Sequence, residues 1–311
     1  MAVLLAGGFG AYYLSRYEPG ADSAYDTGVA SPALAERRPR VLFDAGHNNV
    51  HSLHGRYKPF GRLISSDGCR VSPTSSTFKR ELLQDCEILV VVNAKASGPE
   101  PSAFAPAECD AVRDWVKSGG SLLLVADHHP CGQAAAELAD RFDVEMLGGW
   151  TDDESHARAG SGDPGQLLFT REAGLLAEHP ITGGHPRAER VATVETFTGQ
   201  SLKGPPDSTP LLLLSDTAMD RIPVSWEQTQ KGSQTITTFK TDDRSAAGRC
   251  QGLAMRFGKG RVVVLAEAAM LTAQIDDKSG RPFGMNALDN ENRAFALNVI
   301  RWLAGALDDD Q

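Results

Sequence analysis

Short apolar runs that end on polar residues recur along the first half of the chain. Arg40–Asp44, Cys86–Asn93 and Ser121–Ala126 consist largely of aliphatic residues. Such nearly continuous apolarity is typical of strands covered on both faces of a parallel sheet. The segment from Pro106 to Gly119 carries the apolar stripe of an amphipathic helix, and Gln133–Phe142 is predicted as the next helix. Strands that alternate with helices predict an α/β fold with helices on both faces of a parallel sheet.

The second half of the chain is less regular and adds β segments to this sheet. Thr151–Gln166 is polar and rich in glycine, which predicts a long loop that is either a lid or without fixed structure. Lys231–Gly248 is polar and predicts a surface excursion. The other predicted elements are a helix at Tyr57–Ser66, a strand at Cys69–Ser72, β-like runs at Arg190–Thr198, Pro210–Ser215, Gln251–Phe257 and Arg261–Ala266, and an amphipathic helix from about Asn290.

The N-terminal part is predicted to lie outside the folded domain. Residues 1–17 contain the apolar run Met1–Leu14, which matches a signal-peptide core but is shorter than the ~20 residues of a membrane span. We expect an export signal or a single membrane anchor; the alternative is a first strand or helix packed on the fold. Residues 18–39 predict a linker, 40–307 one folded domain and 308–311 an acidic tail. A periplasmic or other extracytoplasmic location follows, with a cytoplasmic one as the alternative.

Composition excludes several classes of protein. The 311 residues are 41% apolar and 23% charged, as in ordinary globular proteins, which excludes disorder and a multi-span membrane protein. The net charge of −9, without basic stripes, excludes nucleic acid as a partner. A membrane is expected to be contacted only through the N-terminal segment. The 5 cysteines form no C-x-x-C pair, which argues against a disulfide scaffold or a zinc ribbon.

Acidic and histidine side chains follow three of the predicted strands. In open parallel sheets, ligands bind beyond the carboxyl ends of the strands, so these side chains are expected to share one pocket. They could supply a mixed nitrogen and oxygen ligand set for Zn, Mn or Fe, and the metal would activate water for hydrolysis. A structural network of capping carboxylates and a metal-free polar pocket are the alternatives. The candidates are Asp44, His47, Asp127, His128 and Glu267.

Cys131 is the candidate nucleophile. It lies in Pro130–Gln133 at a predicted turn from strand to helix, where a helix dipole could lower the pKa of a thiol. A nucleophilic cysteine also needs a histidine within reach in space. No glycine stands two residues before Cys131, so the usual G-x-C-x-G elbow is absent. A small buried cysteine without chemistry is the simpler interpretation.

Five segments resemble, in the same order, bacterial domains of the class I glutamine amidotransferase-like superfamily. They are Phe43–Asn48, Trp115–His128, His179–Thr182, Gly258–Val264 and Asn292–Gly305. This group includes trehalose-utilisation (ThuA-like) proteins and the related N-terminal domain of an intraflagellar transport protein. The resemblance covers residues 40–307 and implies a flavodoxin-like parallel sheet with flanking helices. Amidotransferases of the superfamily carry a G-x-C-x-G elbow and a downstream His-x-Glu. Neither is intact here, so the resemblance does not imply glutaminase activity.

Together these observations predict an exported or anchored domain without amidotransferase activity. Its expected partner is a small, carbohydrate-like ligand, bound at the C-terminal ends of the strands. A metal-dependent or Cys131-dependent hydrolase is the first alternative, and a non-catalytic protein-interaction module is the second. The sequence leaves open whether the protein is an enzyme; hydrolase-type chemistry is the candidate class.

Overall fold

A computed structural model describes residues 2–4, 10–14, 20–98, 100–183, 189–231, 234–276 and 280–308. Most of the predicted signal or anchor segment, residues 1–17, and most of the acidic tail lie outside these ranges. Strands β1 (Ala2–Leu4) and β2 (Gly10–Leu14) are described from that segment. In the described parts of the chain, no helix has the length and apolarity needed to span a membrane.

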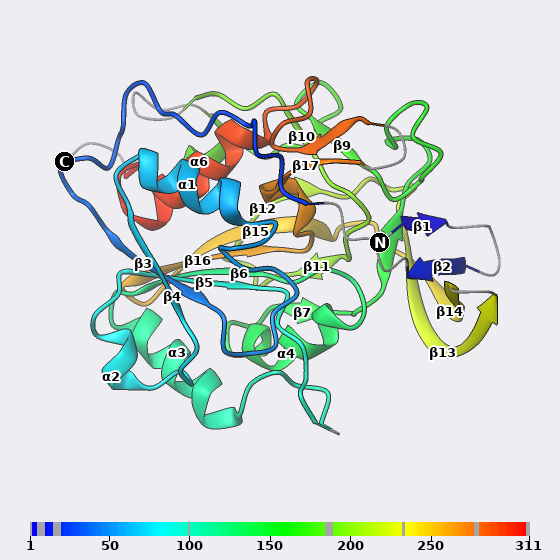
Figure 1. The fold of residues 1–311 in the computed structure, drawn as a ribbon, viewed down its shortest axis with the longest axis horizontal. Coiled ribbons are helices and arrows are strands. Elements are labelled where there is room, and N and C mark those ends of the chain that lie inside the picture. Colours follow the sequence, from blue (N-terminus) through cyan, green and yellow to red (C-terminus); the bar gives the residue numbers. More distant parts are fainter. Residues whose placement is uncertain are drawn as a thin grey trace.

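The first half of the chain, together with one strand of the second half, forms the parallel part of a nine-stranded sheet (Figure 1). The order along the sheet is β4-β3-β5-β6-β16-β15-β11-β7, with β12 paired to β15. The pairs from β4 to β16 are parallel, and β15 runs antiparallel to β16. The parallel strands are β3 (Arg40–Asp44), β4 (Arg70–Thr74), β5 (Ile88–Val92), β6 (Ser121–Val125) and β16 (Gly260–Leu265).

Helices cover both faces of this sheet and bury a separate core on each (Figure 1). Helices α1 (Lys58–Ser66) and α6 (Asn292–Leu303) lie on one face. Helices α2 (Arg80–Leu83), α3 (Pro106–Lys117) and α4 (Cys131–Asp140) lie on the other. Successive side chains of a strand point to opposite faces, so Val90 joins the first core, whereas Leu89 and Val91 join the second. Burial on both sides explains the continuous apolarity of β5.

The second half adds antiparallel strands, as predicted. Its longest feature is the hairpin of β13 (Met219–Lys231) and β14 (Gln234–Ser245), which belongs to a five-stranded sheet of order β1-β2-β14-β13-β8. The surface excursion expected at Lys231–Gly248 is therefore mostly strand. The remaining elements are β7 (Glu145–Met146), β8 (Trp150–Asp152), β9 (Leu168–Thr170), α5 (Pro180–Gly183), β10 (Thr193–Glu195), β11 (Leu202–Lys203), β12 (Thr209–Leu213), β15 (Cys250–Phe257), η1 (Ala269–Leu271), β17 (Ala273–Ile275) and β18 (Pro282–Gly284).

The described part of the predicted linker, residues 20–39, lies against the domain. Ala21 forms a β-bridge with Gln274, and the Asp22 N–H donates to the carbonyl of Ala273 at 2.7 Å. Leu34 is fully buried in the core that also contains α1 and α6. These residues therefore form one wall of the folded unit, next to α1.

Candidate functional site

Four neighbouring parallel strands end at one edge of the sheet and carry polar residues there. Asp44 ends β3, Asn93 follows β5, Asp127 lies two residues after β6, and Glu267 lies two residues after β16. The order β3-β5-β6-β16 brings these ends together, as the sequence predicted for three of them. Asn93 was not predicted. Its Oδ1 accepts a hydrogen bond from the Asp127 N–H at 2.8 Å. Its φ of 44° lies in the left-handed region, which asparagine adopts more readily than most residues, and turns the chain away from the strand.

Asp44 and His47 meet in a buried chain of hydrogen bonds that ends on Glu108. The His47 ring lies between two carboxylates, with Nδ1 at 2.8 Å from Asp44 Oδ1 and Nε2 at 3.1 Å from Glu108 Oε1. Asp44 is fully buried and His47 is 7% exposed. The rings of Phe78 and Phe104 pack on the imidazole, with centroids at 4.6 and 4.7 Å. These contacts enclose His47, so the pair matches the structural network that was one of the sequence-based alternatives.

The interactions around His47 favour a charged imidazole between two charged carboxylates. Burial lowers the pKa of His47, but its hydrogen bonds and charge interactions with Asp44 and Glu108 outweigh burial and raise that pKa. Burial raises the pKa of Glu108, but the N–H groups of Ala105 and Phe78 and the bond from His47 bring it below its usual value. Glu108 was missed because a glutamate in the first turn of a helix is expected to cap that helix. It does so here, and it also binds a histidine 61 positions away in the sequence.

Asp127 is the more open carboxylate of the edge. Its side chain is 19% exposed, and its Oδ1 accepts the N–H of His128 at 2.9 Å. Burial raises the pKa of Asp127, and the charge of His128 and the hydrogen bonds of the carboxylate act in the opposite direction. The His128 ring is 11% exposed and its Nε2 lies 3.9 Å from Asp127 Oδ1. Asp127 and His128 are therefore adjacent and reachable, unlike Asp44.

Glu267, at the end of the neighbouring strand, is fully buried. Its oxygens accept the N–H groups of Ala269 at 2.6 Å and Met270 at 2.7 Å. Burial and the nearby charge of Asp127 raise the pKa of Glu267 well above its usual value, against these hydrogen bonds. Tyr57 is close enough to feel both carboxylates, which together with burial raise its pKa. Asp127 and Glu267 thus form an electrostatically coupled pair, of which one member is shielded from solvent.

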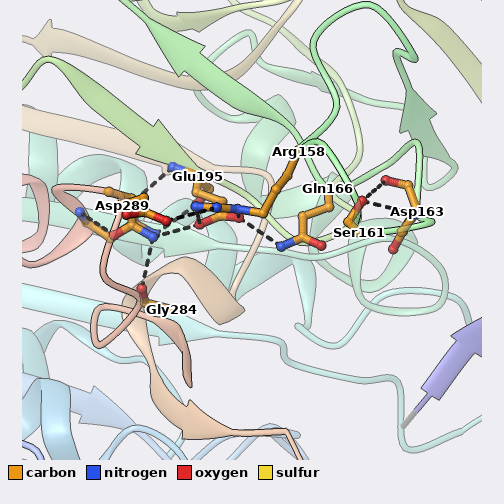
Figure 2. Close-up of polar contacts among 9 residues, drawn as sticks. Arg158, Ser161, Asp163, Gln166, Glu195, Gly284 and Asp289 are labelled. Atoms are coloured by element: carbon orange, nitrogen blue, oxygen red, sulfur yellow. Dashed lines mark hydrogen bonds and ion pairs between the residues drawn. The ribbon is translucent and has the colours of Figure 1, made fainter. Parts of the chain in front are cut away.

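A crossing segment explains why Glu267 is shielded. Residues 195–200 run across the end of β16, where Gln200 N–H donates to the Ala266 carbonyl at 3.1 Å. The loop predicted at Thr151–Gln166 packs on this segment and is held by a buried carboxylate, Glu195 (Figure 2). Arg158 Nη2 donates to Glu195 Oε2 at 2.9 Å, and Gln166 Nε2 donates to Glu195 Oε1 at 2.8 Å. The loop is therefore fixed to the fold in this structure.

Cys131 begins helix α4, at the turn from strand to helix that the sequence predicted. Its side chain is 5% exposed. Burial and the charge of Asp127 raise the pKa of the thiol to about 12, with Lys95 acting weakly in the opposite direction. The Cys131 N–H donates to the backbone carbonyl of His128 at 3.0 Å, at the start of the helix. Cys131 therefore lies at a strand-to-helix turn, where nucleophilic cysteines are found, but its burial and the charge of Asp127 favour the protonated, unreactive thiol.

The five predicted metal ligands divide into two groups. In the first group, His47 binds both Asp44 and Glu108. In the second group, Asp127, His128 and Glu267 follow the ends of β6 and β16. In the ranges that the structure describes, no group of three or more His, Cys, Asp or Glu side chains is arranged to hold a metal ion. The single pocket that all five were expected to share stays a prediction.

An aromatic cluster around His129 was not predicted. The ring of His129 lies 5.2 Å from that of Trp226 and 6.0 Å from that of Phe239. Phe239 also packs on Trp150, at 5.8 Å. Trp226 comes from the β13–β14 hairpin and remains 53% exposed. The sequence contains no local signal for this contact, because Trp226 and Phe239 lie about 100 residues after His129.

Comparisons with known proteins support the fold and leave the activity open. No protein-family model and no curated protein sequence matches the chain. The N-terminal domain of mmIFT52 is similar over 88% of this chain and 99% of that domain, with a TM-score of 0.60 and 14% identity. The cytoplasmic protein STM3548 from Salmonella typhimurium gives a TM-score of 0.47 at 8% identity, over 85% of this chain and 98% of that one. The cytoplasmic protein STM1381 from Salmonella typhimurium LT2 gives 0.45 at 12% identity, over 85% and 99%. The likeness to the mmIFT52 domain confirms the fold that the sequence resemblance implied.

Proposed function

We propose that the protein binds a small, hydroxyl-rich, carbohydrate-like molecule beside Asp127 and His128, at the carboxyl edge of the parallel sheet. The observation that carries the proposal is the exposed Trp226 packed on His129, two residues after Asp127, whose carboxylate is partly exposed. Sugars present hydroxyl groups that donate to carboxylates, and C–H faces that pack on aromatic rings. A few polar groups beside an apolar surface are the usual elements of a small-molecule site.

The position of these residues supports the proposal. In open α/β sheets the crevice beyond the carboxyl ends of the strands is the usual place for a ligand. Asp127 follows β6, a central strand of the parallel part, and its Oδ1 is held by the His128 N–H. A carboxylate oriented in this way offers its remaining lone pairs in a fixed direction. Glu267 contributes indirectly, through its charge interaction with Asp127.

We also propose that the domain does not act as a glutamine amidotransferase. A cysteine attacks as its thiolate, and a thiol with a pKa of about 12 is ionised in roughly one molecule in 10⁵ at pH 7. Cys131 is moreover enclosed, and the negative charge of Asp127 acts on its thiol more strongly than the positive charge of Lys95. An extracytoplasmic or membrane-anchored location, directed by residues 1–17, is part of the same proposal. Fractionation of cells that express the chain with and without residues 1–17 tests that location.

Isothermal titration with a panel of neutral monosaccharides, disaccharides and glycerol tests the binding site. We expect at least one saccharide to bind, and Asp127→Asn and Trp226→Ala each to weaken it by about tenfold or more, because each removes one of the two contacts. Asp216→Asn, an exposed acid outside the site, is the matched control and should leave affinity unchanged. The proposal is wrong if no member of the panel binds at up to about 10 mM, a limit weaker than most specific sites. It is also wrong if both site variants bind like the control.

A further inference from the structure

A cavity lies between the N-terminal wall and the start of helix α1. Its volume is about 460 Å³, within the range of small-molecule sites. The wall is residues 20–27, and the floor is the segment from Val50 to Arg62. Asp22 fixes the wall, because its N–H donates to Ala273 and its Oδ2 accepts from Asn286 Nδ2 at 3.1 Å. The cavity is therefore built from segments that the rest of the fold holds in place.

Cations line this cavity although the protein carries a net charge of −9. Arg56, Lys58 and Arg62 line it together with His54, and Asp22 is the acidic side chain of the lining. The Asp22 carboxylate is already bound by Asn286 and by the N–H of Ala24. Among the described residues, neither Lys58 nor Arg62 pairs with a carboxylate. Positive charge in the cavity therefore exceeds the negative charge that the protein supplies there.

The placement of two of these cations disfavours the helix that carries them. Lys58 and Arg62 stand four residues apart on α1, so they face the same side and repel one another. Lys58 also lies in the first turn, where the helix dipole favours an anion, and that turn contains no acidic residue. A single bound anion would relieve both effects. Local arrangements that cost stability without a gain within the fold are typical of functional sites.

We infer that this cavity binds a small organic molecule through a phosphate group. A phosphate dianion carries the charge and the several acceptor oxygens needed to engage Lys58 and Arg62 together, whereas a carboxylate is satisfied by one arginine. The hydroxyl groups of Ser23, Thr27 and Ser52 lie in the same lining and supply donors for further oxygens. The cavity is larger than a free phosphate requires, and a shallower groove continues from it past Thr27, Lys58 and Arg62. That extra space fits the organic part of the ligand.

Isothermal titration in chloride buffer, with glucose 6-phosphate, inorganic phosphate and glucose as probes, tests this site. We expect glucose 6-phosphate to bind more tightly than inorganic phosphate, and affinity to fall as salt is added, since exposed charges are screened. The double variant Lys58→Gln with Arg62→Gln should weaken binding by about tenfold or more. Lys79→Gln with Arg80→Gln removes the same charge from the opposite face of the sheet and should change affinity less than about twofold. Asp127→Asn should have no effect, which separates this site from the one beside Asp127.

Three results would overturn the inference. The first is no binding of glucose 6-phosphate at up to about 10 mM. The second is an equal loss of affinity in the two double variants, which would indicate attraction by net charge alone. The third is equal affinity for inorganic phosphate and its ester, which would contradict the organic part of the ligand. Circular dichroism spectra of the variants establish that each is folded, and all four substituted side chains are exposed.

Discussion

Replacement of His47 by glutamine tests whether the Asp44–His47–Glu108 chain is structural. Both hydrogen bonds of the imidazole go to carboxylates, at 2.8 and 3.1 Å, and the ring is 7% exposed. Loss of one partner of a fully buried ion pair costs about 3–5 kcal/mol. Asp44 keeps its bonds from Gly46 N–H and Asn49 Nδ2, and Glu108 keeps two backbone donors, so we expect the lower end, about 3 kcal/mol. For a domain of this size that lowers the melting temperature by about 6–12 °C.

The expected loss depends on pH in a direction that follows from the two pKa shifts. The pKa of His47 is raised above its usual 6.5, so its contribution is complete below that pH and disappears as pH rises through the raised value. The pKa of Glu108 is lowered from 4.5, so its contribution is complete above 4.5 and disappears as pH falls through the lowered value. The difference between wild type and His47→Gln should therefore be largest at about pH 5–6 and smaller at pH 9.

Urea unfolding at pH 5.5, 7 and 9, followed by circular dichroism, measures this difference. His54→Gln makes the same substitution at an exposed histidine and should change the free energy of unfolding by less than about 0.5 kcal/mol. A His47→Gln variant within about 1 kcal/mol of wild type at pH 5.5 would refute the structural role. So would a difference that grows between pH 5.5 and pH 9, because the sign of the linkage would then be reversed.

Three further predictions concern stability, reactivity and motion. Asp67→Asn should lower the free energy of unfolding in urea by about 3–5 kcal/mol, because Arg301 binds both Asp67 oxygens at 2.8 Å in the interior; Asp67→Leu combined with Arg301→Met should cost less. In a chromogenic thiol assay at pH 7, the folded chain should react at least about tenfold more slowly than the urea-unfolded chain, since the described cysteines are all buried; equal rates would contradict this. Arg158→Ala should speed amide hydrogen exchange in residues 153–166, whereas unchanged exchange would show that Glu195 does not hold that loop.

The fold could be predicted because burial leaves a direct trace in the sequence. All five residues of β5 and of β6 are buried; β5 is an uninterrupted aliphatic run, and β6 is one after its first residue, Ser121. Strand β14 could not be recognised in the same way. Glu227 and Thr229 on β13 and Lys240 on β14 are exposed, and the polar composition of this hairpin carries no alternation between a buried and a solvent-facing side. A strand of this kind is specified by its partner strand.

The candidate site was predicted less completely, for reasons of distance and of chemistry. The sequence located Asp44, Asp127 and Glu267 at strand ends, because a strand and its terminal residue are local features. It could not predict that Glu108 binds His47, because that contact joins the loop after β3 to the start of α3, 61 positions apart in the sequence. Asn93 was missed for a different reason. An amide has no charge or metal affinity that marks it, yet its Oδ1 holds the backbone at Asp127.

The two coupled carboxylates differ in what they can do, although both follow neighbouring strands. Residues 195–200 cross the end of β16 and leave Glu267 fully buried, whereas the side chain of Asp127 is 19% exposed. Only Asp127 can therefore meet a ligand directly. Burial raises the pKa of both groups, and the charge of Asp127 raises that of Glu267 further. A hydroxyl group that donates to Asp127 stabilises its charged form, so that proton release and ligand binding favour one another there. The negative charge of Asp127 in turn keeps the buried Glu267 in its neutral form, so the charge of the pair lies on the exposed member.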